Sequence, residues 1–134
     1  MQFDMRALPM VTRYKIVNST ITPRPIAWVT TRSQAGIVNL APFSAFTFVA
    51  PKPPMLAISV GHKAGIYKDT ARNIFATEHF VVHIADSSQI GLVHESAVEH
   101  PSDLSEVEHL GLETVPCRHV TPPRLVAAPV AMEC

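Results

Sequence analysis

Residues 23–31 read PRPIAWVTT, and this stretch predicts a β-strand that the chain enters through a stiffened approach. Two prolines restrict the backbone ahead of a run of β-branched and aromatic side chains, which favour extended structure. We therefore expect a strand over residues 26–32 (IAWVTTR). A turn should follow at residues 33–36 (SQAG), because Gly36 can adopt a positive φ.

Working outward from this strand, most of the chain alternates short apolar runs with turn residues and prolines. The chain becomes extended again through Asn39-Leu40-Ala41-Pro42 and residues 43–49, until Pro51, Pro53 and Pro54 end that strand. Further strands are expected at residues 55–60 (MLAISV), 80–85 (FVVHIA) and 125–134, with short ones after residue 115. The sequence thus predicts a mainly β domain.

A few helices are expected to cover this β-structure. Asp69 is the predicted N-cap of the first helix, which would turn Ile74 and Phe75 inward. The second carries apolar residues at helical spacing from Ile90 onward. The predicted helices are residues 70–76, 88–98 and, as a short continuation, 104–112.

Composition limits the classes of protein that the chain can represent. Its 134 residues suit one domain, and 47% apolar against 16% charged residues indicates a globular chain. Eleven basic residues balance eleven acidic ones, so charge does not favour nucleic acid or an anionic membrane. No apolar run is long enough to cross a bilayer, and the first ten residues lack an apolar signal core, so we expect a cytoplasmic location.

Cysteines and histidines do not indicate a reactive centre. Cys117 and Cys134 are far apart, and free thiols are expected over a disulfide in a reducing compartment. His94 and His100 are six residues apart, whereas zinc-binding helices carry histidines four apart, so no metal site is expected. A G-x-G-x-x-G fingerprint is absent, which excludes a Rossmann domain.

The densest chemistry lies in residues 63–73 (KAGIYKDTARN). Lys63, Lys68 and Arg72 place three cations around a predicted helix N-terminus, where free backbone N–H groups favour an anion. Thr70 adds a hydroxyl donor, and Gly65 lets the preceding loop approach a ligand. An ordinary surface helix with solvated basic residues would show the same pattern, so both interpretations stay open on these residues alone.

Two other segments are ambiguous when each is taken by itself. A lone tryptophan on a strand, such as Trp28, is more often a core residue than a ligand contact. Residues 39–44 (NLAPFS) read as the entry to a strand with a proline-fixed turn.

In order and spacing, however, the segments PRPIAWVTT, NLAPFS, KDTARNI and TEHFVVHIA resemble the flavin-reductase-like family, close to its flavoprotein oxygenases and flavoredoxins. The resemblance implies a six-stranded Greek-key split β-barrel that dimerises and holds one FMN per subunit near the dimer interface. Apolar residues 46–55 (FTFVAPKPPM) also favour a homodimer. Residues 1–134 would form one such domain, without the C-terminal part with which family members continue after PVAMEC.

The resemblance also implies which residues contact the flavin. The strand at residues 28–31 would run along the ring, residues 39–44 would supply backbone and hydroxyl contacts, and residues 68–73 would lie at the phosphate end. The residues expected to bind the cofactor are Trp28, Val29, Thr30, Thr31, Asn39, Ala41, Pro42, Phe43, Ser44, Ser59, Lys63, Lys68, Asp69, Thr70 and Asn73.

The activity implied is that of an NAD(P)H:flavin oxidoreductase. NAD(P)H would pass a hydride from its C4 to flavin N5, and reduced flavin would serve a monooxygenase partner or another electron acceptor. This step needs no side-chain acid or base, so no catalytic residue is expected. The alternative is a non-catalytic FMN-binding electron carrier of the flavoredoxin type, which would use the same residues.

Overall fold

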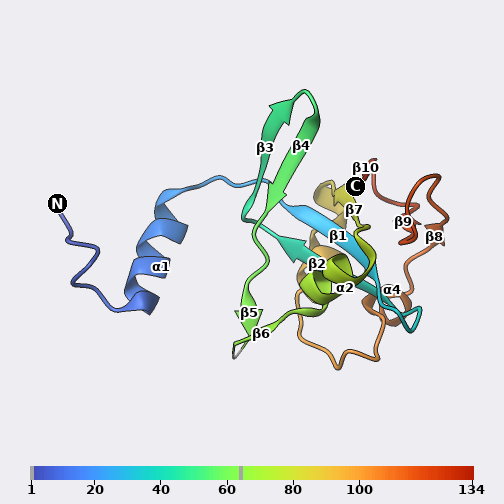
Figure 1. Cartoon of the computed structure of the whole chain (residues 1–134), viewed down its shortest axis with the longest axis horizontal. Coiled ribbons are helices and arrows are strands. Elements are labelled where there is room, and N and C mark those ends of the chain that lie inside the picture. The colour runs from blue at the N-terminus through green and yellow to red at the C-terminus, as the bar shows by residue number, and fades with distance from the viewer. Residues whose placement is uncertain (1, 64) are drawn as a thin grey trace.

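Antiparallel strands dominate the computed structural model, which describes residues 2–63 and 65–134, the side chain of Lys63 excepted (Figure 1). The strands are β1 (Ala27–Arg32), β2 (Val38–Phe43), β3 (Phe46–Pro51), β4 (Pro54–Ile58), β5 (His62–Lys63), β6 (Ile66–Tyr67), β7 (Val81–Ile84), β8 (Thr114–Val115), β9 (Arg124–Leu125) and β10 (Val130–Glu133). The helices are α1 (Met10–Thr20), α2 (Asp69–Thr77), α3 (Ile90–Glu95) and α4 (Glu106–His109), with a 3₁₀ turn at Ser87–Gln89. The mainly β fold expected from the sequence is confirmed.

The largest sheet has four strands in the order β10-β7-β1-β2, all antiparallel. Strand β1 lies between β2 and β7, and its residues from Ala27 to Thr31 are fully buried. The turn between β1 and β2 has Gly36 at a φ of 90°, as expected. Strand β2 is one of the two outer strands of this sheet, and a cavity lies along it.

The two faces of this sheet carry different cores. On one face, Trp28 and Leu40 pack with Val107, Leu125 and Ala128. On the other face, Ala27, Val29 and Phe43 pack with Val82 and with apolar residues of β3, β4 and β10. Alternate residues of β1 therefore point to opposite cores, as the two-residue period of a strand requires.

Helix α2 covers the end of the second face, but it differs from the expectation in its cap and its buried side. Lys68, not Asp69, is the N-cap. Phe75 is 69% exposed rather than turned inward, and the buried residues of the helix are Thr70, Ala71 and Asn73. The helix docks on the polar end of the sheet, so its buried face is polar and apolar periodicity does not reveal it.

Other boundaries also differ from the expected ones. The extended run expected at residues 43–49 is divided between β2 and β3, and the chain turns back from Pro51 into β4 at Pro54. The helix expected at residues 88–98 begins as a 3₁₀ turn, and Ile90 is 67% exposed. The short third helix forms as α4. Within the described residues, the main sheet holds four strands and the other strands pair two by two.

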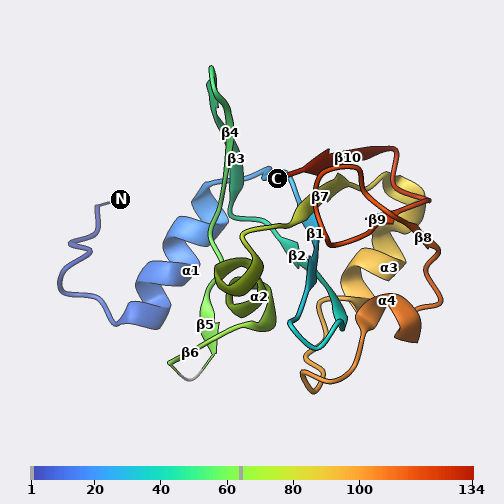
Figure 2. The ribbon, with the colours of Figure 1, turned by 45° about the vertical axis from the view of Figure 1, so that its right-hand side comes forward.

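Helix α1 and the β3–β4 hairpin extend away from the rest of the molecule, α1 standing apart from the sheet in both views (Figures 1 and 2). No residue of α1 is buried. Arg24 holds the end of α1 by donating to the carbonyls of Asn18, at 2.6 Å, and Ile21, at 2.9 Å. It also donates to the Ser44 hydroxyl at 3.2 Å, which links this end to the junction of β2 and β3.

Both cysteines are free thiols. Burial raises the pKa of the Cys134 thiol above its usual value. Over the described residues, no helix is long and apolar enough to span a membrane.

Candidate flavin site

A cavity of about 400 Å³ lies along β2, an outer strand of the main sheet, beside the start of α2. Its volume falls within the roughly 300–1,000 Å³ that is typical of small-molecule sites. Strand β2, the start of α2 and a segment around residues 96–100 form its walls. The lining residues are Asn39, Ala41, Pro42, Phe43, Ile66, Tyr67, Lys68, Asp69, Thr70, Arg72, Ser96, Ala97, Val98, Glu99, His100 and Glu106.

The N-terminus of α2 is the part of the cavity best suited to an anion. Its N-cap, Lys68, has extended backbone angles, and no side chain caps the first turn. The N–H groups of that turn therefore have no capping acceptor, and the helix dipole adds positive potential. Lys68 itself is exposed at the cavity and forms no ion pair with the described residues.

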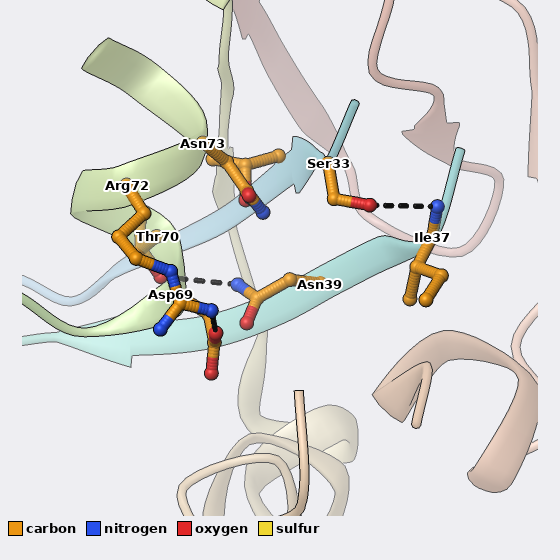
Figure 3. Close-up of polar contacts among 8 residues, drawn as sticks. Ser33, Ile37, Asn39, Asp69, Thr70, Arg72 and Asn73 are labelled. Carbon is orange, nitrogen blue, oxygen red and sulfur yellow. Dashed lines mark hydrogen bonds and ion pairs between the residues drawn. The ribbon is translucent and has the colours of Figure 1, made fainter. Parts of the chain in front are cut away.

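The acidic residue at this position is neutralised within the helix. Asp69 and Arg72, three residues apart, form an ion pair (Figure 3). The pair offsets the negative charge that Asp69 would otherwise place next to an anion. Arg72 is engaged in turn, so among the described side chains the charge of Lys68 remains for a ligand at this end.

Two hydrogen bonds fix the start of α2 on the sheet. Asn39 Nδ2 donates to Thr70 Oγ1 at 3.0 Å, and Asn73 Nδ2 donates to Thr31 Oγ1 at 3.0 Å. Figure 3 shows Asn39 extending from β2 to the helix beside Asp69 and Arg72. Because Thr70 accepts from Asn39, its hydroxyl hydrogen stays available to an acceptor in the cavity.

One lining residue outside β2 and α2 was not expected from the sequence. Glu106, at the start of α4, lines the cavity although it is only 8% exposed, and its Oε2 accepts the N–H of Leu40 at 2.9 Å. Ser105 could have been found as a helix start, because Ser105 and Glu108 have the spacing of a capping box. The contact from Glu106 to Leu40 spans 66 residues and has no local signal in the sequence.

Seven of the expected cofactor-binding residues come together in the cavity. They are Asn39, Ala41, Pro42, Phe43, Lys68, Asp69 and Thr70. Asn73 lies on the buried side of α2, and Ser44 lies just past β2, where it accepts from Arg24. Ser59 is exposed and does not line the cavity, while the side chain of Lys63 lies outside the described residues.

The four expected residues of β1, Trp28, Val29, Thr30 and Thr31, lie behind the cavity wall with fully buried side chains. Trp28 Nε1 donates to Ser96 Oγ at 2.8 Å, and Ser96 lines the cavity. Thr30 Oγ1 donates to the Pro123 carbonyl at 2.7 Å. These side chains support the residues of the cavity rather than lining it.

A buried histidine contacts the backbone of Trp28. His83 Nδ1 lies 2.9 Å from the Trp28 carbonyl oxygen, and its Nε2 accepts the N–H of Leu125 at 3.0 Å. Burial lowers the pKa of His83 below its usual value; the bond to the Trp28 carbonyl opposes this effect, and the charge of Arg124 adds to it. The ring is therefore neutral, with its hydrogen on Nδ1.

Comparison with known proteins places the chain in a defined family. Residues 19–134 match the flavin reductase like domain family, so the chain belongs to that family. Its fold is the split barrel of flavin reductases and flavoredoxins, as the sequence resemblance indicated.

Three similar proteins illustrate the relationship. A protein of Halalkalibacterium halodurans is 41% identical over 135 residues, which cover 100% of this chain and 65% of that protein. The solved nitrilotriacetate monooxygenase component B of Bacillus cereus is 36% identical, with a TM-score of 0.96 over 100% of this chain and 66% of its own. The 2-nitrobenzoate 2-nitroreductase NbaA of Pseudomonas fluorescens is 33% identical, with a TM-score of 0.90 over 100% and 64%. The chain thus spans about two thirds of the length of these relatives.

Proposed function

We propose that the cavity along β2 binds FMN, with its phosphate at the N-terminus of α2. The observation that carries the proposal is the uncapped first turn of α2, which meets the cavity beside Lys68 and Thr70. A phosphate there would accept from backbone N–H groups, from the Thr70 hydroxyl and from the Lys68 ammonium group, which is the donor set that anions take at helix N-termini.

The remaining walls suit a flat, largely apolar ring. Ala41, Pro42 and Phe43 of β2 line the cavity, together with Ala97 and Val98 of the segment around residues 96–100. Alternate residues of a strand direct their backbone groups to opposite edges. Leu40 directs its N–H outward, to Glu106, so the backbone of residue 42 also faces outward. Proline at position 42 therefore removes no hydrogen bond between β2 and β1. In this proposal the buried residues of β1 act by positioning β2.

The proposed activity is transfer of a hydride from NAD(P)H to the flavin. Bound FMN would supply the redox chemistry, as the hydride acceptor and electron donor. The chain's own residues hold the phosphate, form the walls around the ring and exclude water from it. The similarity to a monooxygenase component supports a monooxygenase as the partner that receives reduced flavin. The similarity to a nitroreductase makes a nitroaromatic compound the second candidate acceptor.

Steady-state oxidation of NADH and of NADPH, each with FMN in excess, tests this activity. Continuous turnover that requires FMN is expected. A single stoichiometric reduction without turnover would instead support the electron carrier. Addition of 2-nitrobenzoate in place of free flavin tests the second acceptor.

Release of the bound flavin by heat, followed by chromatography, identifies the cofactor, and recovery of mainly FAD would contradict the FMN proposal.

We also propose a homodimer. Large apolar side chains are exposed on α1 and on the β3–β4 hairpin, namely Met10, Val11, Tyr14, Val17, Phe48, Val49 and Met55. An 11-residue helix without packing is marginal in water, because isolated helices shorter than about 12–15 residues gain too little to offset nucleation. A second copy of the chain that covers these elements would stabilise both. The cytoplasmic location expected from the sequence stays a prediction.

A further inference from the structure

The outer edge of β2 is closed by two side chains from the start of α4. Ser105 Oγ donates to the carbonyl oxygen of Val38 at 2.7 Å, and Glu106 Oε2 accepts the N–H of Leu40 at 2.9 Å. Both side chains are buried, with exposed fractions of 7% and 8%. We name Ser105 and Glu106 the edge clamp, because they take the place that a further strand would occupy along β2.

The residue held between the two bonds of the edge clamp is Asn39. Its neighbours Val38 and Leu40 are bound by the clamp on the outer edge, and Asn39 itself pairs with Thr31 of β1 on the inner edge. The backbone is therefore fixed on both edges at a position whose side chain is hydrogen-bonded to α2. Asn39 Nδ2 in turn donates to Thr70 Oγ1, at the proposed phosphate end of the cavity.

We propose that Glu106, supported by Ser105, is a positioning residue for the phosphate end of the flavin site and that it acts through Asn39 on Thr70. The inference rests on the proposed FMN site. The Glu106 carboxylate accepts the N–H of Leu40, and this bond requires a side chain long enough to reach from α4 to the edge of β2. Losing this bond frees the outer edge of β2 at Leu40 and loosens the bond from Asn39 to Thr70. The loss should weaken binding of the phosphate group of the ligand, because Thr70 is one of the proposed phosphate donors.

Three variants of Glu106 separate the effect of side-chain length from the effect of its charge. Glu106→Gln keeps both the length and an acceptor oxygen, Glu106→Asp keeps the charge but is one methylene shorter, and Glu106→Ala removes the acceptor. Glu108→Ala is the matched control, because Glu108 lies exposed on the same helix. The dissociation constants of FMN and riboflavin are measured for each variant by quenching of flavin fluorescence, at a temperature where thermal unfolding shows it to be folded.

We expect the Ala and Asp variants to bind FMN about tenfold more weakly, as the loss of one hydrogen bond implies, with riboflavin affinity changed less than about threefold. The Gln variant and the Glu108 control should stay within about threefold of the wild type for both ligands. Combining Glu106→Ala with Asn39→Ala should weaken FMN no further than Asn39→Ala alone, because both changes act on the same contact.

Three outcomes would overturn the inference. Equal losses for FMN and riboflavin would show that Glu106 only supports folding, and fully additive losses in the double variant would show that it does not act through Asn39. Wild-type affinity in the Asp and Ala variants would exclude any positioning role. A wild-type protein that binds neither flavin would instead refute the FMN site itself, and this inference with it.

Discussion

Thr31 and Asn39 lie directly opposite one another on β1 and β2, and each is hydrogen-bonded to helix α2. Their partners, Asn73 and Thr70, are three residues apart and so lie on the same face of the helix. The start of α2 is thereby attached to one point of the sheet by two buried bonds. This attachment fixes where the free N–H groups of the helix meet the cavity.

The bond between Asn73 and Thr31 should contribute to stability, because both residues are buried. We expect Asn73→Ala to lower the free energy of unfolding by about 1–3 kcal/mol, since it leaves the fully buried Thr31 hydroxyl without this donor. Urea denaturation followed by circular dichroism measures the change. Gln34→Ala, in the exposed β1–β2 turn, is the control and should stay within about 0.5 kcal/mol of the wild type.

Lys68 should contribute to binding through the phosphate alone. A charge-assisted bond of about 1.5–3 kcal/mol corresponds to one to two decades in the dissociation constant. Lys68→Ala should therefore weaken FMN by about 10- to 100-fold and leave riboflavin nearly unchanged, as measured by fluorescence titration. Arg118→Ala removes an exposed cation outside the cavity and should leave both affinities unchanged. Equal losses of both ligands in Lys68→Ala would mean that Lys68 supports the fold instead.

His83 should make stability depend on pH. Its pKa is lowered in the folded state, mainly by burial, so at acidic pH the unfolded chain takes up a proton that the fold does not. The contribution of neutral His83 is therefore complete above the unfolded pKa of about 6.5 and declines below it, by at most about 1.4 kcal/mol per pH unit, until the folded pKa is reached.

Urea denaturation at pH 7.5 and pH 5.5 measures this decline. His83→Gln cannot titrate, so we expect it to be less stable than the wild type at pH 7.5 but to lose less stability between the two pH values. Equal losses in both proteins would assign the pH dependence to other groups.

The strands could be predicted because their signals are local. The β-branched residues of β1 and the glycine of the following turn specify a strand and its end without reference to the rest of the chain. The cavity residues of β2 and α2 were expected from the order and spacing of several sequence motifs taken together, because each motif alone was ambiguous. The sequence alone left both the anion site and an ordinary surface helix open at Lys68.

The features that the sequence did not reveal depend on contacts between residues far apart in the chain. Phe75 was expected to face inward from its apolar character, yet α2 buries Thr70 and Asn73, whose partners are strand residues 31 and 42 positions away. The indole of Trp28 donates to Ser96, 68 residues away, a contact that its place on the strand did not indicate, and the expected position of this strand along the flavin stays a prediction. Polar contacts of this kind leave no periodic pattern in the sequence, so only the fold reveals them.

Finally, the exposed apolar surface of α1 and the β3–β4 hairpin leads to a prediction about assembly. Phe48 is 62% exposed on the hairpin, and Tyr14 is 68% exposed on α1. Placing a charge at Phe48 should disfavour an interface there, because the charge would be desolvated without a partner. We expect the wild type to be a dimer at micromolar concentration and Phe48→Asp to be largely monomeric. Ile90→Asp is the control, because Ile90 is 67% exposed on α3, outside both elements.

Light scattering over a dilution series measures the mass of each variant, and flavin fluorescence recorded in parallel reports whether binding depends on the dimer. If the second copy stabilises α1, the helical signal in circular dichroism should also fall as the protein dissociates, since the 11-residue helix loses its packing. A monodisperse wild-type monomer that retains FMN at low micromolar concentration would contradict the homodimer. A Phe48→Asp protein that stays dimeric would place the interface elsewhere than the hairpin.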